Sequence, residues 1–185
     1  VKRFLCVGTI GLRKGQWLLT EAFARIHASV PDWRLTIVGR FADDMVRQMV
    51  MTPLTDPAVL AKVDFVEKAS DAEVKAFYGS SEIFVMPSLE EGLGLTLQEA
   101  LFYGCACITA RAGGTEDLVA DGDNGLLIDR NHVPQLAEAM MRLATDDGLR
   151  SCLVARGPES IEEKGMNAAS MGRRHAALYL SLIHI

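Results

Sequence analysis

Two glutamates stand eight positions apart in the stretch 88–104, SLEEGLGLTLQEALFYG. Glu91 precedes an expected helix and Glu99 lies inside it, so both supply carboxylate acceptors for hydroxyl groups. Between them, Gly92 and Gly94 have no Cβ, which lets the backbone adopt unusual angles and approach a ligand closely. The first turn of a helix presents unpaired N–H groups and a partial positive charge, so a phosphate is the expected anion there. Phosphate and polyol together predict a sugar nucleotide as the ligand.

A second loop of this kind, 8–15 (GTIGLRKG), carries two cations that could meet the same phosphates. Arg13 and Lys14 stand where a helix is expected to begin, a position that disfavours cations unless an anion is nearby. The loop matches neither GxxxxGK[ST] nor a full GxGxxG. Solvated charges at a helix start remain the alternative for both residues.

Strands and helices must bring these loops together, and hydrophobic periodicity predicts which segments do so. Strands are expected at 3–8, 33–39, 63–66, 83–86 and 106–109, with another after the turn at 121–125. Helices are expected at 15–26, 41–51, 71–78, 97–104, 116–119, 134–143, 149–155 and 167–180, whereas 53–62 is expected to be an irregular surface connection. This alternation predicts an α/β fold, a Rossmann-like three-layer parallel sheet with helices on both faces.

The two acids also carry a resemblance to a known family. Glu91-x7-Glu99, in the setting EGLGLTLQEA and followed by Gly104, resembles the E-x7-E signature of retaining, nucleotide-sugar-dependent glycosyltransferases of the family 4 type. Those enzymes have two Rossmann-like domains (the GT-B architecture), and the similarity, from about residue 3 to about residue 144, is to the C-terminal, donor-binding half. It implies a glycosyltransferase with no cofactor and no protein-bound metal.

The resemblance also implies roles for individual residues. In such enzymes the counterpart of Glu91 contacts donor-sugar hydroxyls, that of Glu99 contacts the ribose, and two loop cations bind the diphosphate. Thr9 stands where the family usually has Arg, so Lys14 is carried over and Arg13 is proposed as a substitute. Glu91, Lys14 and Arg13 are thus the expected catalytic residues. The expected donor-binding residues are Gly8, Thr9, Val66, Glu67, Gly92, Leu93, Gly94, Leu95, Thr96 and Glu99.

Other interpretations remain open at this stage. Thr96 and Glu99 form a Thr-x-x-Glu capping box, which would give Glu99 a structural role, and Glu91 could belong to a solvated acidic turn. The loop at 111–119, with Gly113 and Gly114, either approaches the donor or acceptor or is a plain turn in which Thr115 caps a short helix. For the whole site, the alternatives are a non-catalytic nucleotide-binding or regulatory module and a sugar-nucleotide epimerase of the same fold.

Composition narrows the class of protein. The 185 residues are 49% hydrophobic and carry a net charge of −5 without a Lys/Arg cluster, which indicates a globular domain that does not bind nucleic acid. The four cysteines lie in apolar segments and are expected to be buried free thiols, and the histidines form no zinc-ligand spacing with them. Asp121 and Asp123 imitate a metal-binding DxD, but DGDNG before LLI is typical of a turn into a strand.

The expected organisation is a nucleotide-sugar-binding domain at 1–165, followed at 166–185 by a C-terminal helix and a tail, SLIHI, that resembles non-native sequence. A start without Met predicts a fragment, and the resemblance implies that this fragment lacks the N-terminal acceptor domain and is inactive alone. The expected partners are a UDP-, GDP- or ADP-sugar donor and the missing domain. Any peripheral membrane association is expected to occur through that domain. With no signal peptide or membrane-length apolar run, a cytoplasmic location is expected.

Overall fold

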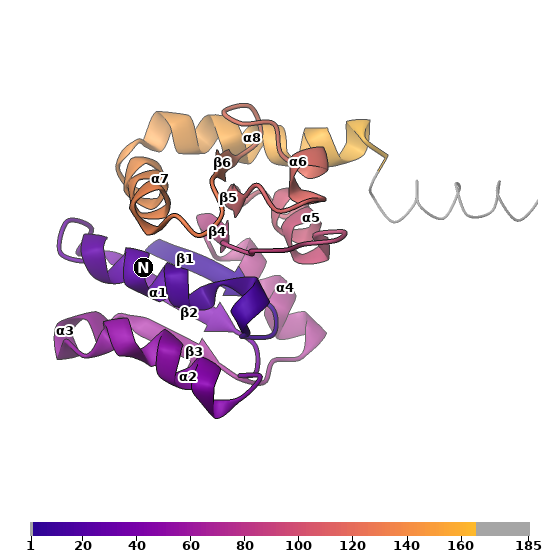
Figure 1. The fold of residues 1–185 in the computed structure, drawn as a ribbon. Helices are drawn as coiled ribbons and strands as arrows, with labels where there is room; N and C mark the ends of the chain where they lie inside the picture. Colours follow the sequence, from indigo (N-terminus) through magenta and orange to yellow (C-terminus); the bar gives the residue numbers. More distant parts are fainter. Residues whose placement is uncertain (1, 166–185) are drawn as a thin grey trace, which may run out of the picture.

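The computed structural model describes residues 2–165, and its centre is a sheet of parallel strands (Figure 1). The strands are β1 (Lys2–Val7), β2 (Trp33–Val38), β3 (Val63–Val66), β4 (Ile83–Met86), β5 (Ala106–Ala110) and β6 (Leu126–Ile128). Every residue of β4, β5 and β6 is buried, as expected of strands covered on both faces. The strand order is β3-β2-β1-β4-β5-β6, so the chain changes direction between β1 and β4. In open α/β sheets, ligands bind at the carboxyl ends of the strands beside such a change.

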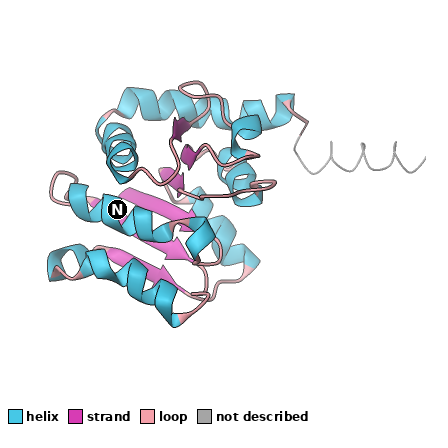
Figure 2. Ribbon diagram, in the orientation of Figure 1, coloured by secondary structure: helices cyan, strands magenta, loops and turns pink. Residues whose placement is uncertain are grey.

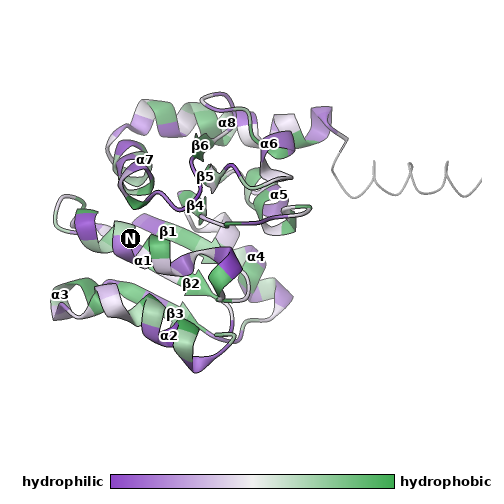
Figure 3. Cartoon of the chain, in the orientation of Figure 1, coloured by the Kyte–Doolittle hydropathy of each residue, from purple (hydrophilic) through white to green (hydrophobic). Residues whose placement is uncertain are grey.

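Helices cover the sheet on both sides, which confirms the predicted α/β class (Figure 2). One layer holds α1 (Gln16–Ile26), α2 (Asp44–Met51), α3 (Pro57–Leu60) and α7 (Val133–Thr145), and the other holds α4 (Asp71–Gly79), α5 (Leu95–Phe102) and α6 (Thr115–Leu118). Strand alternation divides the core accordingly: Phe4 and Cys6 pack in the first layer and Leu5 in the second. Polar and apolar residues alternate in bands along α1 and α2, whose apolar faces meet the sheet (Figure 3).

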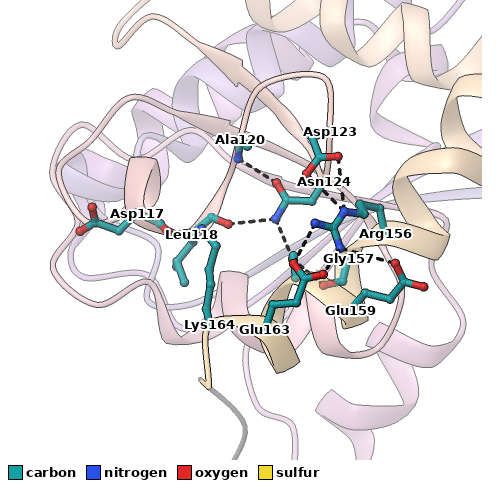
Figure 4. Close-up of polar contacts among 11 residues, drawn as sticks. Asp117, Leu118, Ala120, Asp123, Asn124, Arg156, Gly157, Glu159, Glu163 and Lys164 are labelled. Atoms are coloured by element: carbon teal, nitrogen blue, oxygen red, sulfur yellow. Dashed lines mark hydrogen bonds and ion pairs between the residues drawn. The ribbon is translucent and has the colours of Figure 1, made fainter.

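The last described helix, α8 (Asp147–Glu163), joins the two layers, since Leu153 belongs to one core and Ile161 to the other. A buried amide fastens it to the loop before β6. Asn124, only 1% exposed, accepts from the Ala120 N–H (2.8 Å) and donates to the Leu118 carbonyl (2.9 Å; Figure 4). Its amide also donates to the Ser160 hydroxyl of α8 (2.7 Å).

Several boundaries differ from expectation. The segment at 53–62 is not irregular: it holds α3 and part of the 3-10 helix η2 (Thr52–Leu54), because Asp56 caps α3 by accepting from the Ala58 N–H (2.8 Å). The helix expected from residue 41 begins at Asp44, since Asp43 caps it. The helix expected at 149–155 is longer and includes Pro158.

Two further predictions concern the cysteines and the C-terminal end. Cys152 is exposed and not buried, because it faces away from the core on α8, whereas Cys6, Cys105 and Cys107 are buried free thiols. The helix expected at 167–180 lies outside the described residues, as does the tail.

Candidate functional site

Two loops meet where β1 and β4 end. The loop after β1 includes the 3-10 helix η1 (Leu12–Lys14), and the loop after β4 begins at Pro87. The Leu89 N–H donates to the Arg13 carbonyl (2.8 Å). Gly15 has a φ of +68°, and a Cβ there would lie 2.3 Å from the Pro87 carbonyl oxygen. The two backbones are therefore in direct contact, and only glycine fits between them.

The contact brings a predicted cation and a predicted acid together. Lys14 Nζ donates to Glu91 Oε2 at 2.6 Å, a link between residues 77 positions apart. The Ser88 hydroxyl donates to the same oxygen at 3.4 Å. The side chains of Lys14 and Glu91 are 26% and 11% exposed, so this charged pair is largely shielded from water but open on one side.

The first turn of α5 begins beside this pair. Gly94 is its N-cap residue, with a φ of +57°, and gives no side-chain cap. Within residues 2–165, the N–H groups of Leu95 and Thr96 have no hydrogen-bond acceptor, while those of Leu97 and Gln98 donate to the Gly94 carbonyl. Two backbone donors and the positive end of the helix dipole are therefore available to an anion.

The capping-box interpretation of Thr96 and Glu99 is wrong, because the helix begins one residue before Thr96. The Thr96 hydroxyl instead points to Met86 Sδ (3.7 Å). The Glu99 carboxylate accepts from the Tyr78 hydroxyl at 3.0 Å. Glu99 lines a cavity of about 560 Å³ between α4 and α5, which Glu91 does not line, so the two acids contact different parts of the surface.

A larger cavity, of about 600 Å³, lies at the carboxyl ends of β1 to β3. Of the predicted donor-binding residues, it is lined by Gly8, Thr9 and Glu67, whereas Val66 packs against the second-layer core. Glu67 is bound to Arg47 of α2 at 2.7 Å. The buried strand ends make part of the cavity wall apolar, and the charged side chains make another part polar.

Sequence reasoning missed part of this cavity. Gly39 and Arg40 line it, and the signal was a glycine directly after β2, as Gly8 is directly after β1. A Cβ at Gly39 would lie 2.0 Å from the Gly8 carbonyl oxygen, so two glycines allow the two strand ends to touch. Lys68, which also lines the cavity, had no distinguishing pattern.

Several of the predicted residues are exposed. Arg13 and Thr9 both face solvent, and within the described part of the chain the Arg13 guanidinium has no ion pair. Leu93 and Leu95 are 73% and 58% exposed, which leaves apolar side chains at the entrance to the α5 first turn.

The loop after β5 holds the backbone of Glu91. The Glu91 N–H donates to the Ala112 carbonyl (3.1 Å), and the Gly114 N–H donates to the Glu91 carbonyl (3.3 Å). A Cβ on Gly114 would lie 1.7 Å from the Gly92 carbonyl oxygen. Thr115 does not cap α6, which begins after Gly114; its hydroxyl instead donates to the Ala110 carbonyl and so closes the loop (2.6 Å).

Other candidate chemistry takes no part here. Burial raises the pKa of the Cys6 thiol to about 12 despite the nearby Lys14, which keeps the thiol neutral and unreactive. Asp121 accepts from the Leu127 N–H (2.8 Å) and Asp123 pairs with Arg156 (3.4 Å), as in a turn. Within residues 2–165, no group of three or more His, Cys, Asp or Glu side chains could hold a metal ion.

None of the helices within residues 2–165 is both long enough and apolar enough to cross a membrane.

The chain is similar to a known protein family and to individual known proteins. The family described as "Glycosyl transferases group 1" matches residues 1–160. The phosphatidyl-myo-inositol mannosyltransferase of Mycolicibacterium smegmatis is 30% identical over 159 residues, which are 85% of this chain and 40% of that protein. A lipopolysaccharide core biosynthesis glycosyltransferase of Rhizobium meliloti is 30% identical over 157 residues, 85% of this chain and 44% of that protein. The chain thus spans less than half the length of these relatives.

Solved structures share the architecture. The C-terminal domain of a glycosyl transferase group 1 family protein from Francisella tularensis has a TM-score of 0.77 and 25% identity, covering 88% of this chain and 85% of that one. Anabaena HepE, solved in complex with UDP and glucose, has a TM-score of 0.87 and 18% identity, covering 97% of this chain and 48% of that one. The latter likeness shows a common fold alone.

Proposed function

Because the chain belongs to the glycosyl transferases group 1 family, we propose that it is the donor-binding domain of an enzyme that transfers a sugar from a nucleotide-diphosphate sugar, with retention of anomeric configuration and without a protein-bound metal. The observation that carries this proposal is the Lys14–Glu91 pair, 2.6 Å apart, beside the amides of Leu95 and Thr96, which have no acceptor among residues 2–165. The site thus offers a cation and two N–H donors to phosphate oxygens and a carboxylate to hydroxyls. One protein of the same fold, Anabaena HepE, has been solved with UDP and with UDP-glucose, ligands of the class proposed here.

In the proposed mechanism, the rate enhancement comes from stabilising the leaving group. When the anomeric C–O bond breaks, negative charge grows on the diphosphate, and Lys14, with Arg13 and the first-turn amides of α5, stabilises that charge more strongly than it stabilises the bound donor. Glu91 holds the sugar hydroxyls and Glu99 the ribose, so both position the donor and neither attacks it. The base enters the cavity beside Val66 and Glu67.

The acceptor belongs to a different part of the enzyme. Acceptor sites of two-domain enzymes lie between domains, and this chain spans 40% of a full-length relative. We therefore expect the chain alone to bind donor weakly and to transfer little or no sugar. We also propose a cytoplasmic location.

Calorimetric titration of the chain with UDP-, GDP- and ADP-sugars tests the proposal. We expect binding of one nucleotide class, weakened about tenfold or more in Lys14→Ala because a charge-assisted hydrogen bond to phosphate is lost. The matched control is Lys2→Ala, because Lys2 lies at the opposite end of β1 and, among the described residues, its ammonium group pairs with Asp147 (3.9 Å) and lies over the Trp33 ring. Absence of binding to every donor at millimolar concentration would refute the proposal.

One variant separates catalysis from simple nucleotide binding. If the domain were a non-catalytic nucleotide-binding module, the sugar would add no affinity beyond that of the nucleotide, in the wild type or in Glu91→Ala. The proposal requires the sugar to add affinity in the wild type and Glu91→Ala to remove that gain. An epimerase would convert donor with no acceptor added, which a product assay detects.

A further inference from the structure

A buried phenol stands directly behind Glu99. Tyr78, in the last turn of α4, is 1% exposed although its hydroxyl is polar. That hydroxyl donates to Glu99 Oε2 (3.0 Å) and lies 3.2 Å from the Thr96 carbonyl oxygen, so it touches both a side chain and the backbone of α5. Desolvation, and then the Glu99 charge, raise the pKa of Tyr78 above its ordinary value, so the phenol keeps its proton and remains a donor.

The ring that carries this hydroxyl is fixed in place. Tyr78 stacks on Tyr103 with centroids 5.7 Å apart and planes 3° apart, and it packs against Phe84 at 5.8 Å. Glu99, by contrast, is an exposed residue on α5 whose long side chain would otherwise sample several rotamers. The rigid phenol therefore selects one orientation of a mobile carboxylate.

The selected orientation leaves one oxygen available. Oε2 is engaged by Tyr78, whereas Oε1 has no hydrogen-bond donor among the described residues. The cavity of about 560 Å³ that Glu99 lines is also lined by Tyr78 and Leu95, so its wall joins the first turn of α5. A carboxylate fixed there can accept from a hydroxyl of a ligand whose phosphates lie at that first turn.

We infer that Tyr78 is a positioning residue for donor binding: its hydroxyl orients Glu99 so that Oε1 accepts from a ribose hydroxyl. This inference rests on the proposed function. It assigns to α4, through the Tyr78 hydroxyl, a part in recognising the ribose.

The test compares ribonucleotides with deoxyribonucleotides. Whichever of UDP, GDP and ADP binds the wild-type chain is titrated by calorimetry, alongside its 2′-deoxy and 3′-deoxy forms, against wild type, Tyr78→Phe and Tyr103→Phe. Tyr103→Phe is the matched control because it removes a hydroxyl from the stacked partner ring that makes no hydrogen bond among the described residues. Thermal unfolding checks that each variant is folded.

The expected result is a change in preference and not only in affinity. Wild type and Tyr103→Phe should prefer the ribonucleotide by about tenfold, as for a hydrogen bond to a charged group, and Tyr78→Phe should prefer it by about threefold or less. In a Glu99→Ala background, Tyr78→Phe should cause no further loss of preference. A merely structural role would lower affinity for all three nucleotides equally.

The alternatives are distinguishable. An unchanged ribose preference in folded Tyr78→Phe overturns the inference and leaves the proposed function standing, whereas no binding of any nucleotide to wild type overturns both. If Tyr78→Phe does not fold, proton NMR of the wild type decides: the Tyr78 hydroxyl proton must shift on addition of the ribonucleotide and shift less with the form that lacks the contacted hydroxyl. Equal shifts overturn the inference.

Discussion

The ion pair between Lys14 and Glu91 joins two groups that a donor would use separately, one at the phosphates and one at the sugar. In the free domain each neutralises the other, at 2.6 Å and with little exposure. Phosphate must therefore compete with Glu91 for the ammonium group, and the nearby carboxylate also repels it.

Glu91→Gln is expected to separate these two effects. The amide keeps the shape of the side chain but releases Lys14, so affinity for a sugar-free diphosphate such as UDP should rise by about threefold to tenfold, or about 0.7–1.4 kcal/mol. The additional affinity contributed by the sugar should fall. Calorimetry with UDP and a UDP-sugar measures both values.

Glu90→Gln is the matched control, because this exposed neighbour has no ion pair among the described residues. It removes the same charge without touching Lys14. An equal rise in UDP affinity for both variants would show that only overall charge matters, and no rise for Glu91→Gln would contradict the competition.

At the scale of elements, three strand-to-helix loops are fitted against one another by glycine. Gly15 allows the β1 loop to touch Pro87, and Gly114 allows the β5 loop to touch Gly92. The loop with Glu91 is thus held from both sides, which places the α5 first turn without a side-chain cap.

Gly114→Ala should disrupt this arrangement. Its Cβ would lie 1.7 Å from a backbone oxygen, which cannot rotate away, so one of the two loops must move. We expect a loss of about 1–3 kcal/mol of unfolding free energy in urea, accompanied by weaker donor binding. Gly79→Ala, where a Cβ meets nothing within 4 Å, serves as the control and should retain full stability; a Gly114→Ala protein as stable as that control would contradict the packing argument.

The elements themselves were largely predictable. β4 and β5 are apolar at nearly every position, and helical periodicity marks α1 and α7, so pattern alone predicts a parallel sheet with two helical layers. The short helix α3 was missed, because it is too short to show periodicity and its start is fixed by a single capping residue, Asp56. The start of α5 was ambiguous from the sequence. Thr96 and Glu99 match a capping box, but the N-cap residue is Gly94, which has a positive φ.

The site was predictable only in part, because the sequence indicates the order of the elements but not how two helices pack. Loops after β1 and β4 were each expected to bind phosphate, and strand order makes them neighbours, so the meeting of Lys14 and Glu91 follows from topology. The Tyr78–Glu99 contact does not, because it depends on how α4 and α5 pack. No spacing between those two residues distinguishes it from chance.

For the whole molecule, α8 ties the β6 side of the sheet together through Asn124. Asn124→Ala would leave the Leu118 carbonyl, the Ala120 N–H and the Ser160 hydroxyl without their buried partner. We expect a loss of about 2–4 kcal/mol, measured by urea unfolding, because unsatisfied buried groups keep their full desolvation penalty.

The neighbouring Asp123→Ala is the matched control. It removes a surface ion pair with Arg156 at 3.4 Å, which contributes about 0–1 kcal/mol. Equal losses for the two variants would mean that the buried amide contributes no more than the surface pair.

The strand order also has a consequence for biosynthesis. The first three strands leave the ribosome well before β4, yet β1 pairs with β4 in the finished sheet. Until β4 emerges, a nascent chain has β1 as an open edge, able to pair with a strand of another polypeptide, and its lysine lacks the carboxylate that later neutralises it. Synthesis of β4 covers that edge, and Glu91 follows a few residues later, so the sheet closes and the Lys14–Glu91 ion pair forms at nearly the same stage of synthesis.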